Sequence, residues 1–222
     1  MRTRPDHIPS TSLPIRVWGD YARWGVPGAE RMTYDIPTVS GMIGTIRSIY
    51  WKPEIRYIID RIEILSTPQT MLVTTNEVST KISLWGKELA SQDAGKIHTQ
   101  RSSLILCQPD YIVWIRPYLV NFDPATYRGD LAKHVKMLEQ RVAKGQCFKT
   151  PYLGCREFSA KFALAEDDLK PIQDTRFIGT MPFLRLYGPD QAPMTMIQNV
   201  IMENGVVDYP QESYDNIFSQ LT

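Results

Sequence analysis

The segment that organises the chain is Ile55 to Leu65, with the sequence IRYIIDRIEIL. It is rich in isoleucine, and β-branched residues are enriched in strands, so it predicts a strand. Pro53 ends the element before it, because proline cannot donate the next helical hydrogen bond and restricts the residue that precedes it. That element, which begins after Pro37-Thr38, is expected to be a helix with one apolar face at Met42, Ile43, Ile46, Ile49 and Tyr50.

Further strands are expected on both sides of this helix–strand pair. Residues 14–21 (PIRVWGDY) alternate in polarity and predict a first strand. Residues 104–106 and 111–118 predict two more, separated by Pro109. The chain therefore begins with the order strand, helix, strand and continues with strands.

A second helix is predicted at 131–142, followed by a strand at 153–164. The glycine at position 145 supplies the helix stop, and the apolar side chains recur at i, i+4, i+7 and i+11, namely Leu131, Val135, Leu138 and Val142. The complete order fits a split-βαβ, ferredoxin-like sandwich. We therefore expect an α+β fold with a ferredoxin-like domain at residues 1–165.

Beyond residue 165 the sequence changes character. Acidic residues and prolines become frequent, and strand candidates at 197–202 and 206–209 flank Asn204-Gly205, a strong hairpin signal. We expect residues 166–222 to form a small antiparallel β-rich domain appended to the body.

Composition excludes several classes of protein. A hydrophobic content of 43% excludes a disordered chain, and no apolar run approaches the roughly 18 residues of a membrane helix. The first residues lack the apolar region of a secretory signal peptide, so we expect a cytoplasmic protein with no membrane association. Three cysteines without a C-x-x-C pair, and three scattered histidines, indicate neither a disulfide framework nor a metal site. We expect no metal and no cofactor.

The formal net charge of +1 hides an uneven distribution. Residues 131–161 contain seven basic and two acidic residues, a net charge of +5, whereas residues 162–222 contain three basic and nine acidic residues, a net charge of −6. A charge run is usually a solvated face. The alternative is a strip that binds an anion, and the basic candidates for contact with such an anion are Lys136, Arg141, Lys144, Lys149 and Arg156.

The second helix carries the residues best suited to chemistry. His134 lies at the margin of its apolar face and is adjacent to Lys133, while Lys133, Lys136, Gln140 and Lys144 form a basic stripe. RNA contains its own nucleophile, the 2′-hydroxyl, so its cleavage needs a proton-transfer group and cations for the charge on phosphorus. Lys133 and His134 fit these roles. A core-edge histidine with a satisfied ring is the plainer interpretation.

Three aromatic residues near the end of the first helix extend this hypothesis. Tyr50 supplies a phenolic donor if the two helices pack side by side, although a core tyrosine is equally consistent with the sequence. Trp51 and Tyr57 are candidates for stacking on bases, a role for which core packing is again the commoner alternative. The sequence contains no G-x-x-x-x-G-K-[ST], H-E-x-x-H or G-x-S-x-G motif.

Five blocks in the same order resemble the Cas-five family of subtype I-C CRISPR systems. They are IYWKP (49–53), NEV-x-x-KIS (76–83), KGQCF (144–148), PYLGCREF (151–158) and MENGVVDYP (202–210). The resemblance implies a RAMP-type, RRM-related fold and an endoribonuclease that processes precursor crRNA without metal, leaving a 5′-hydroxyl and a 2′,3′-cyclic phosphate. It implies a catalytic set that carries over to Tyr50, Lys133 and His134.

The resemblance also implies partners. The protein would stay on the 5′ handle of the repeat RNA and join the backbone and large subunits of a surveillance complex, meeting target DNA indirectly. The chain departs from many relatives at Thr74 and Thr75, where they have arginines, and at Lys149, where they often have histidine. A non-catalytic subunit that binds the handle remains an alternative, and a small-molecule enzyme on a ferredoxin-like scaffold is a third hypothesis.

Overall fold

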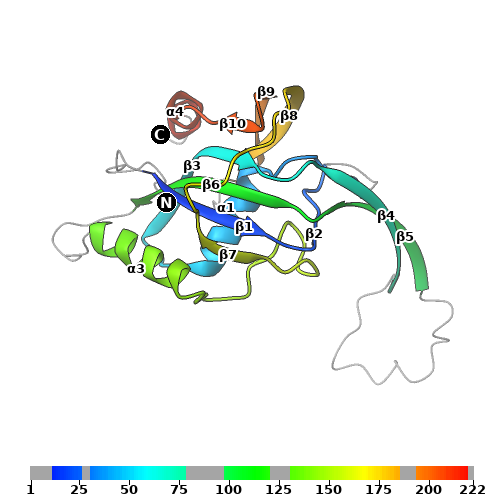
Figure 1. Ribbon diagram of the computed structural model, residues 1–222, viewed down its shortest axis with the longest axis horizontal. Helices are drawn as coiled ribbons and strands as arrows, with labels where there is room; N and C mark the ends of the chain where they lie inside the picture. Colours follow the sequence, from blue (N-terminus) through cyan, green and yellow to red (C-terminus); the bar gives the residue numbers. More distant parts are fainter. Residues whose placement is uncertain (1–11, 27–30, 79–97, 121–130, 186–193, 220–222) are drawn as a thin grey trace, which may run out of the picture.

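The centre of the molecule is a five-stranded sheet in the order β10-β3-β6-β1-β7 (Figure 1). This computed structural model describes residues 12–26, 31–78, 98–120, 131–185 and 194–219; His7 and residues 79–83 of the NEV block lie outside them. Every neighbouring pair in the sheet is antiparallel. Its strands are β1 (Leu13–Trp18), β3 (Ile55–Ile64), β6 (Asp110–Leu119), β7 (Lys161–Leu164) and β10 (Val206–Asp208).

Two helices pack against this sheet and share its apolar core. Helix α1 (Val39–Ile49) lies against β3, and helix α3 (Leu131–Ala143) lies against β6 and β7. Buried apolar side chains of β3 and β6 belong to the same core cluster as those of α1. Intervening positions carry polar pairs, Arg116 with Asp60 and Trp114 Nε1 with Glu63 at 2.7 Å. Apolar and polar side chains thus alternate along β3 and β6, so each strand has one face in the core.

The structure confirms the predicted strand at 55–65, both predicted helices and the strand at 111–118. Thr38 caps α1, since its side chain accepts from the Gly41 N–H, and Gly145 follows α3 with a φ of +63°. The predicted strand at 153–164 was wrong over most of its length, because β7 begins at Lys161. Residues 153–158 instead form a tight loop in which the Leu153 N–H donates to the Phe158 carbonyl.

A long arm projects from the body (Figure 1). Strands β4 (Gln69–Val78) and β5 (His98–Cys107) pair in register along their whole lengths, and β2 (Tyr21–Ala22) adds a short third strand. The sequence predicted only the last part of β5. Leu72 and Thr74 are exposed on this arm, which explains why its strands lack the strong apolar signal of β3.

The C-terminal segment contributes to two sheets. Strands β8 (Arg176–Arg185) and β9 (Met194–Met202) pair with each other. The predicted turn at Asn204-Gly205 is confirmed, with φ values of 49° and 76°, but the predicted hairpin of strands 197–202 and 206–209 was wrong, because only an isolated bridge between Glu203 and Val206 joins them. Beyond that bridge the chain leaves β9, and β10 pairs with β3 in the main sheet. The domain boundary near residue 165 stays a prediction.

The tyrosine at position 214 fastens the last helix to the main sheet. Tyr214 lies on α4 (Gln211–Ser219) and is fully buried. Its hydroxyl donates to the Ile59 carbonyl at 2.7 Å and accepts from the Ile59 N–H at 3.0 Å. Strand β10 pairs with β3 only from Arg61 to Glu63. Tyr214 thus satisfies the backbone polar groups that β10 does not reach.

We expect Tyr214→Phe to lower the free energy of unfolding by about 1–3 kcal/mol, because it leaves a buried N–H without its acceptor. Urea unfolding of the full chain measures this change. Tyr21→Phe is the control, since Tyr21 is 40% exposed. Equal midpoints for Tyr214→Phe and the unaltered protein would contradict the role assigned to this hydroxyl.

Candidate active site

Tyr50 leaves α1 and turns into the core. It has an extended backbone, with φ −139° and ψ 121°, and its N–H still donates to the Ile46 carbonyl at 3.1 Å. The Tyr57 hydroxyl donates to the Tyr50 carbonyl at 2.6 Å and fixes the main chain. The side chain of Tyr50 is 1% exposed. Its position therefore follows from where the helix ends.

His134 meets Tyr50 from the neighbouring helix. It lies on the buried side of α3 with Leu138 and Val142 and is 6% exposed. The Tyr50 hydroxyl and His134 Nδ1 are 2.8 Å apart, and the same hydroxyl lies 3.7 Å from Met137 Sδ. The packing of α1 beside α3 thus joins the two residues in a buried hydrogen bond.

Two charged groups flank this pair. Glu54 Oε1 lies 3.8 Å from His134 Nε2. On the other side, the Arg141 guanidinium lies 5.2 Å from the centre of the Tyr50 ring and donates to the Ile49 carbonyl at 3.3 Å. Burial raises the pKa of Tyr50 above its ordinary value; Arg141 acts to lower it and Glu54 to raise it further. Tyr50 is therefore held as a neutral phenol at neutral pH.

The arrangement is a row of proton-transfer groups. When the Tyr50 hydroxyl donates to Nδ1, the imidazole proton resides on Nε2 and faces Glu54. When the imidazole is doubly protonated, Nδ1–H donates to the phenolic oxygen instead. Tyr50 and His134 can therefore exchange a proton through their hydrogen bond, as general acid–base catalysis requires, whereas Glu54 acts on His134 through its charge.

Lys133 lies apart from this row. It is exposed, whereas its neighbour His134 is buried, as expected for consecutive residues that point about 100° apart on a helix. The structure brings Tyr50 and His134 together and leaves Lys133 on the solvent side of α3.

The candidate RNA-contacting residues also divide into two groups. Lys136, Lys144, Lys149 and Arg156 are exposed. Arg141 is half-buried against Tyr50, so the guanidinium supports the aromatic ring. Of the two candidates for base stacking, Tyr57 is 3% exposed and belongs to the core, whereas Trp51 is 36% exposed.

Glu54 was missed in the sequence, although it lies one residue beyond the IYWKP block that contains Tyr50. A carboxylate four residues after the tyrosine was a usable signal, because the turn that ends α1 keeps both near each other. Thr74 and Thr75 lie exposed on the arm. Thr74 Oγ1 lies 3.1 Å from Ser102 Oγ.

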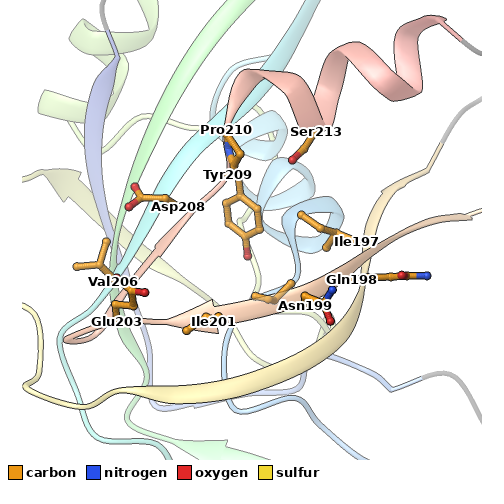
Figure 2. Close-up of a pocket in the computed structure, with 11 residues that line it drawn as sticks. Ile197, Gln198, Asn199, Ile201, Glu203, Val206, Asp208, Tyr209, Pro210 and Ser213 are labelled. Atoms are coloured by element: carbon orange, nitrogen blue, oxygen red, sulfur yellow. The ribbon is translucent and has the colours of Figure 1, made fainter.

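Other candidate sites were sought among the described residues. No three His, Cys, Asp or Glu side chains there gather closely enough to hold a metal ion. Nor does any helix in this part of the chain have the length and hydrophobicity needed to span a membrane. A cavity of about 370 Å³ lies between β9, β10 and the start of α4, and Tyr50 does not line it. Figure 2 shows the Tyr209 side chain in this cavity, extending toward β9.

Comparison with known proteins identifies the family. The model of the family described as CRISPR-associated protein (Cas_Cas5) matches residues 12–215. The chain is a Cas5 protein. It is 30% identical over 215 residues to the CRISPR pre-crRNA endoribonuclease Cas5d of Mannheimia succiniciproducens, covering 89% of this chain and 94% of that one. It is 37% identical over 157 residues to the protein of the same name from Thermus thermophilus, covering 68% and 63%.

Solved structures support the fold of this Cas5 chain. A structure described as a CRISPR-associated protein superimposes with a TM-score of 0.71 at 19% identity, covering 93% of this chain and 96% of that one. A chain of a CRISPR RNA-guided surveillance complex superimposes with a TM-score of 0.52 at 12% identity, covering 95% and 99%. At these identities the similarity establishes a shared fold of mixed helices and antiparallel sheets.

The charges around Tyr50 predict opposite effects of two substitutions. Arg141→Gln removes the cation that lowers the pKa of Tyr50, so this pKa rises, and Glu54→Gln removes the anion that raises it, so the pKa falls. NMR titration of protein labelled at the tyrosine ring carbons measures both, with the signal assigned by its loss in Tyr50→Phe. Arg61→Gln, at an exposed pair with Asp208, is the control. Shifts in the same direction for both variants would contradict the arrangement.

Proposed function

We propose that this Cas5 protein is an endoribonuclease that cleaves the repeat of precursor crRNA without metal and then remains on the 5′ handle. The observation that carries the proposal is the buried hydrogen bond between Tyr50 and His134, flanked by Glu54 and adjacent to a basic helix face. Relatives at 30% and 37% identity are named for this activity. The protein would work in the cytoplasm with the backbone and large subunits of a surveillance complex, meeting target DNA through them.

The proposed reaction is an internal transfer at phosphorus. The 2′-hydroxyl attacks the adjacent phosphate, its proton passes to the Tyr50–His134 pair, and the 5′-oxygen leaves after receiving a proton from the same pair. The products are a 2′,3′-cyclic phosphate and a 5′-hydroxyl, so atoms and protons balance. The Lys133 ammonium would offset the charge that develops on the phosphate oxygens from the solvent side of α3, where it is exposed.

We further propose that the body of the protein is a ferredoxin-like domain and that residues 166–222 are its β-rich appendage. The order of elements supports this assignment. Along the chain, the pattern βαββαβ is formed by β1, α1, β3, β6, α3 and β7. In the sheet, the four strands of this pattern lie in the order β3-β6-β1-β7. In this scheme β10 is an added edge strand, contributed by the appendage.

A second candidate function is a non-catalytic subunit that binds the 5′ handle. The observation that favours it is burial: Tyr50 is 1% exposed and His134 is 6% exposed, so a phosphate must displace covering groups to reach them. A hydrogen bond that only fixes α1 to α3 would have the same geometry. The two functions differ in whether purified protein cuts the RNA that it binds.

We expect His134→Gln to slow cleavage of repeat RNA in EDTA by about 10²–10⁴-fold, because glutamine cannot take up a proton at neutral pH. Tyr50→Phe should also cleave the RNA more slowly than the unaltered protein. Both variants should bind RNA nearly as tightly as the unaltered protein does. A gel of end-labelled RNA measures cleavage, and a filter assay measures binding.

Lys170→Ala, at an exposed lysine in the acidic segment, is the control and should cut normally. Undiminished cleavage by His134→Gln would overturn the catalytic role. Unaltered protein that binds the repeat and never cuts it would establish the second function.

The exposed basic residues predict a modest salt dependence of RNA binding. Each single alanine variant of Lys136, Lys144, Lys149 or Arg156 should weaken binding and reduce the slope of log K against log salt by about one, if it contacts a phosphate. Lys170→Ala should leave the slope unchanged. A slope for the unaltered protein as steep as that of a binder of about ten phosphates would contradict a local basic surface.

A further inference from the structure

Two large aromatic side chains lie exposed together beside the candidate active site. Trp51 directly follows Tyr50 and is 36% exposed, and Phe148, in the loop after α3, is 54% exposed. Their ring centres are 6.0 Å apart with an angle of 31° between the planes. Lys149 Nζ lies 5.6 Å from the centre of the Phe148 ring. We call Trp51, Phe148 and Lys149 the aromatic platform.

Backbone hydrogen bonds fix this platform in place. The last carbonyls of a helix have no partner within the helix and need one elsewhere. Here the Phe148 N–H donates to the carbonyls of Ser48 at 2.9 Å and Ile49 at 3.1 Å, and the Lys149 N–H donates to Ser48 at 2.9 Å. The exposed rings are therefore held by the end of the same helix that positions Tyr50, without being buried.

The charge around the platform favours a nucleic acid over a protein partner. Lys52 and Lys144 are exposed, Lys149 lies near the Phe148 ring, and residues 131–161 carry a net charge of +5. The exposed apolar side chains of β8 and β9 offer a contrast. That surface lies in a segment with a net charge of −6, so it suits a protein partner better than a nucleic acid. Its exposed apolar side chains are Phe177, Met194, Met196 and Ile201.

We propose that the aromatic platform stacks an unpaired base of the bound RNA, next to the Tyr50–His134 pair. Proteins recognise RNA largely through unstacked bases that lie on aromatic side chains, and stacking accepts any base because each has a π face. A base held on Trp51 and Phe148 would anchor the strand at the residue that directly follows Tyr50. The inference rests on the proposed function in that it assumes that the protein binds RNA, but not that it cuts it.

The test uses the full chain and a repeat hairpin made of 2′-O-methyl RNA, which 2′-hydroxyl attack cannot cut. One version has single-stranded flanks, and a second has abasic nucleotides in those flanks. Trp51→Ala and Phe148→Ala should each weaken binding of the flanked hairpin by about 5- to 150-fold, the range of stacking on one base. Trp51→Phe and Phe148→Tyr should bind nearly normally, because they keep an aromatic face.

Two controls separate stacking from other effects. Phe177→Ala removes a ring that is 66% exposed on the β8–β9 surface and should leave RNA binding unchanged. With abasic flanks, Phe148→Ala and the unaltered protein should bind equally, since no base remains to stack. Thermal unfolding checks that the variants are folded, which the exposure of both side chains leads us to expect.

Each outcome decides between the proposals. Normal binding by both alanine variants overturns the platform, while cleavage of unmodified RNA by the same protein would leave the proposed function standing. An equal loss of affinity for the hairpin with abasic flanks in the alanine variants also overturns the platform. Alanine variants that bind RNA normally but fail to join other subunits overturn it too, because the surface is then a protein interface. A base-dependent loss in a protein that never cuts RNA supports the platform and removes the catalytic function. Failure of the unaltered protein to bind methylated or unmethylated repeat RNA overturns both.

Discussion

The carbonyls at the C-terminal end of α1 have no partner within the helix, and their need for partners elsewhere is the constraint on which the rest of this structure depends. Ser48 and Ile49 accept hydrogen bonds from the backbone of Phe148 and Lys149, and Ile49 also accepts one from the Arg141 side chain. These bonds bring the end of α3 and its following loop onto the end of α1. Because Tyr50 is the next residue, the same bonds hold α3 beside the position where the Tyr50 hydroxyl meets His134.

The elements that could be predicted from sequence are those whose own residues carry the signal. Strand β3 is rich in isoleucine, and α1 and α3 have apolar faces with clear stops. The loop at 153–158 was mistaken for a strand, whereas the Leu153 N–H donates to the Phe158 carbonyl within the loop and the Leu153 carbonyl accepts from the Arg23 N–H. Helix α4 was missed because the segment beyond residue 165 was interpreted as β-rich; in the structure, the Tyr214 hydroxyl of this helix donates to the Ile59 carbonyl.

The candidate site shows the same limit. Tyr50, Lys133 and His134 were nominated from residue type and position on their helices, and the contact between Tyr50 and His134 depends on helix packing that sequence suggests only loosely. Glu54 and Arg141 acquire their positions from a turn and from a bond to a carbonyl of another helix. The contact of Arg141 leaves no pattern in a single sequence, whereas the spacing of Glu54 from Tyr50 does.

The pairing of β10 with β3 has a consequence for how the molecule is made. A strand at the edge of a sheet presents unpaired backbone groups that can recruit another chain. Here the β3 edge is covered by Val206–Asp208 and by the hydroxyl of Tyr214, more than 140 positions after the strand that they cover. Because synthesis proceeds from the N-terminus, the nascent sheet carries an open β3 edge until residues 206–214 have been made. Strand β10 and Tyr214 thus close an edge that would otherwise be open to pairing with another chain.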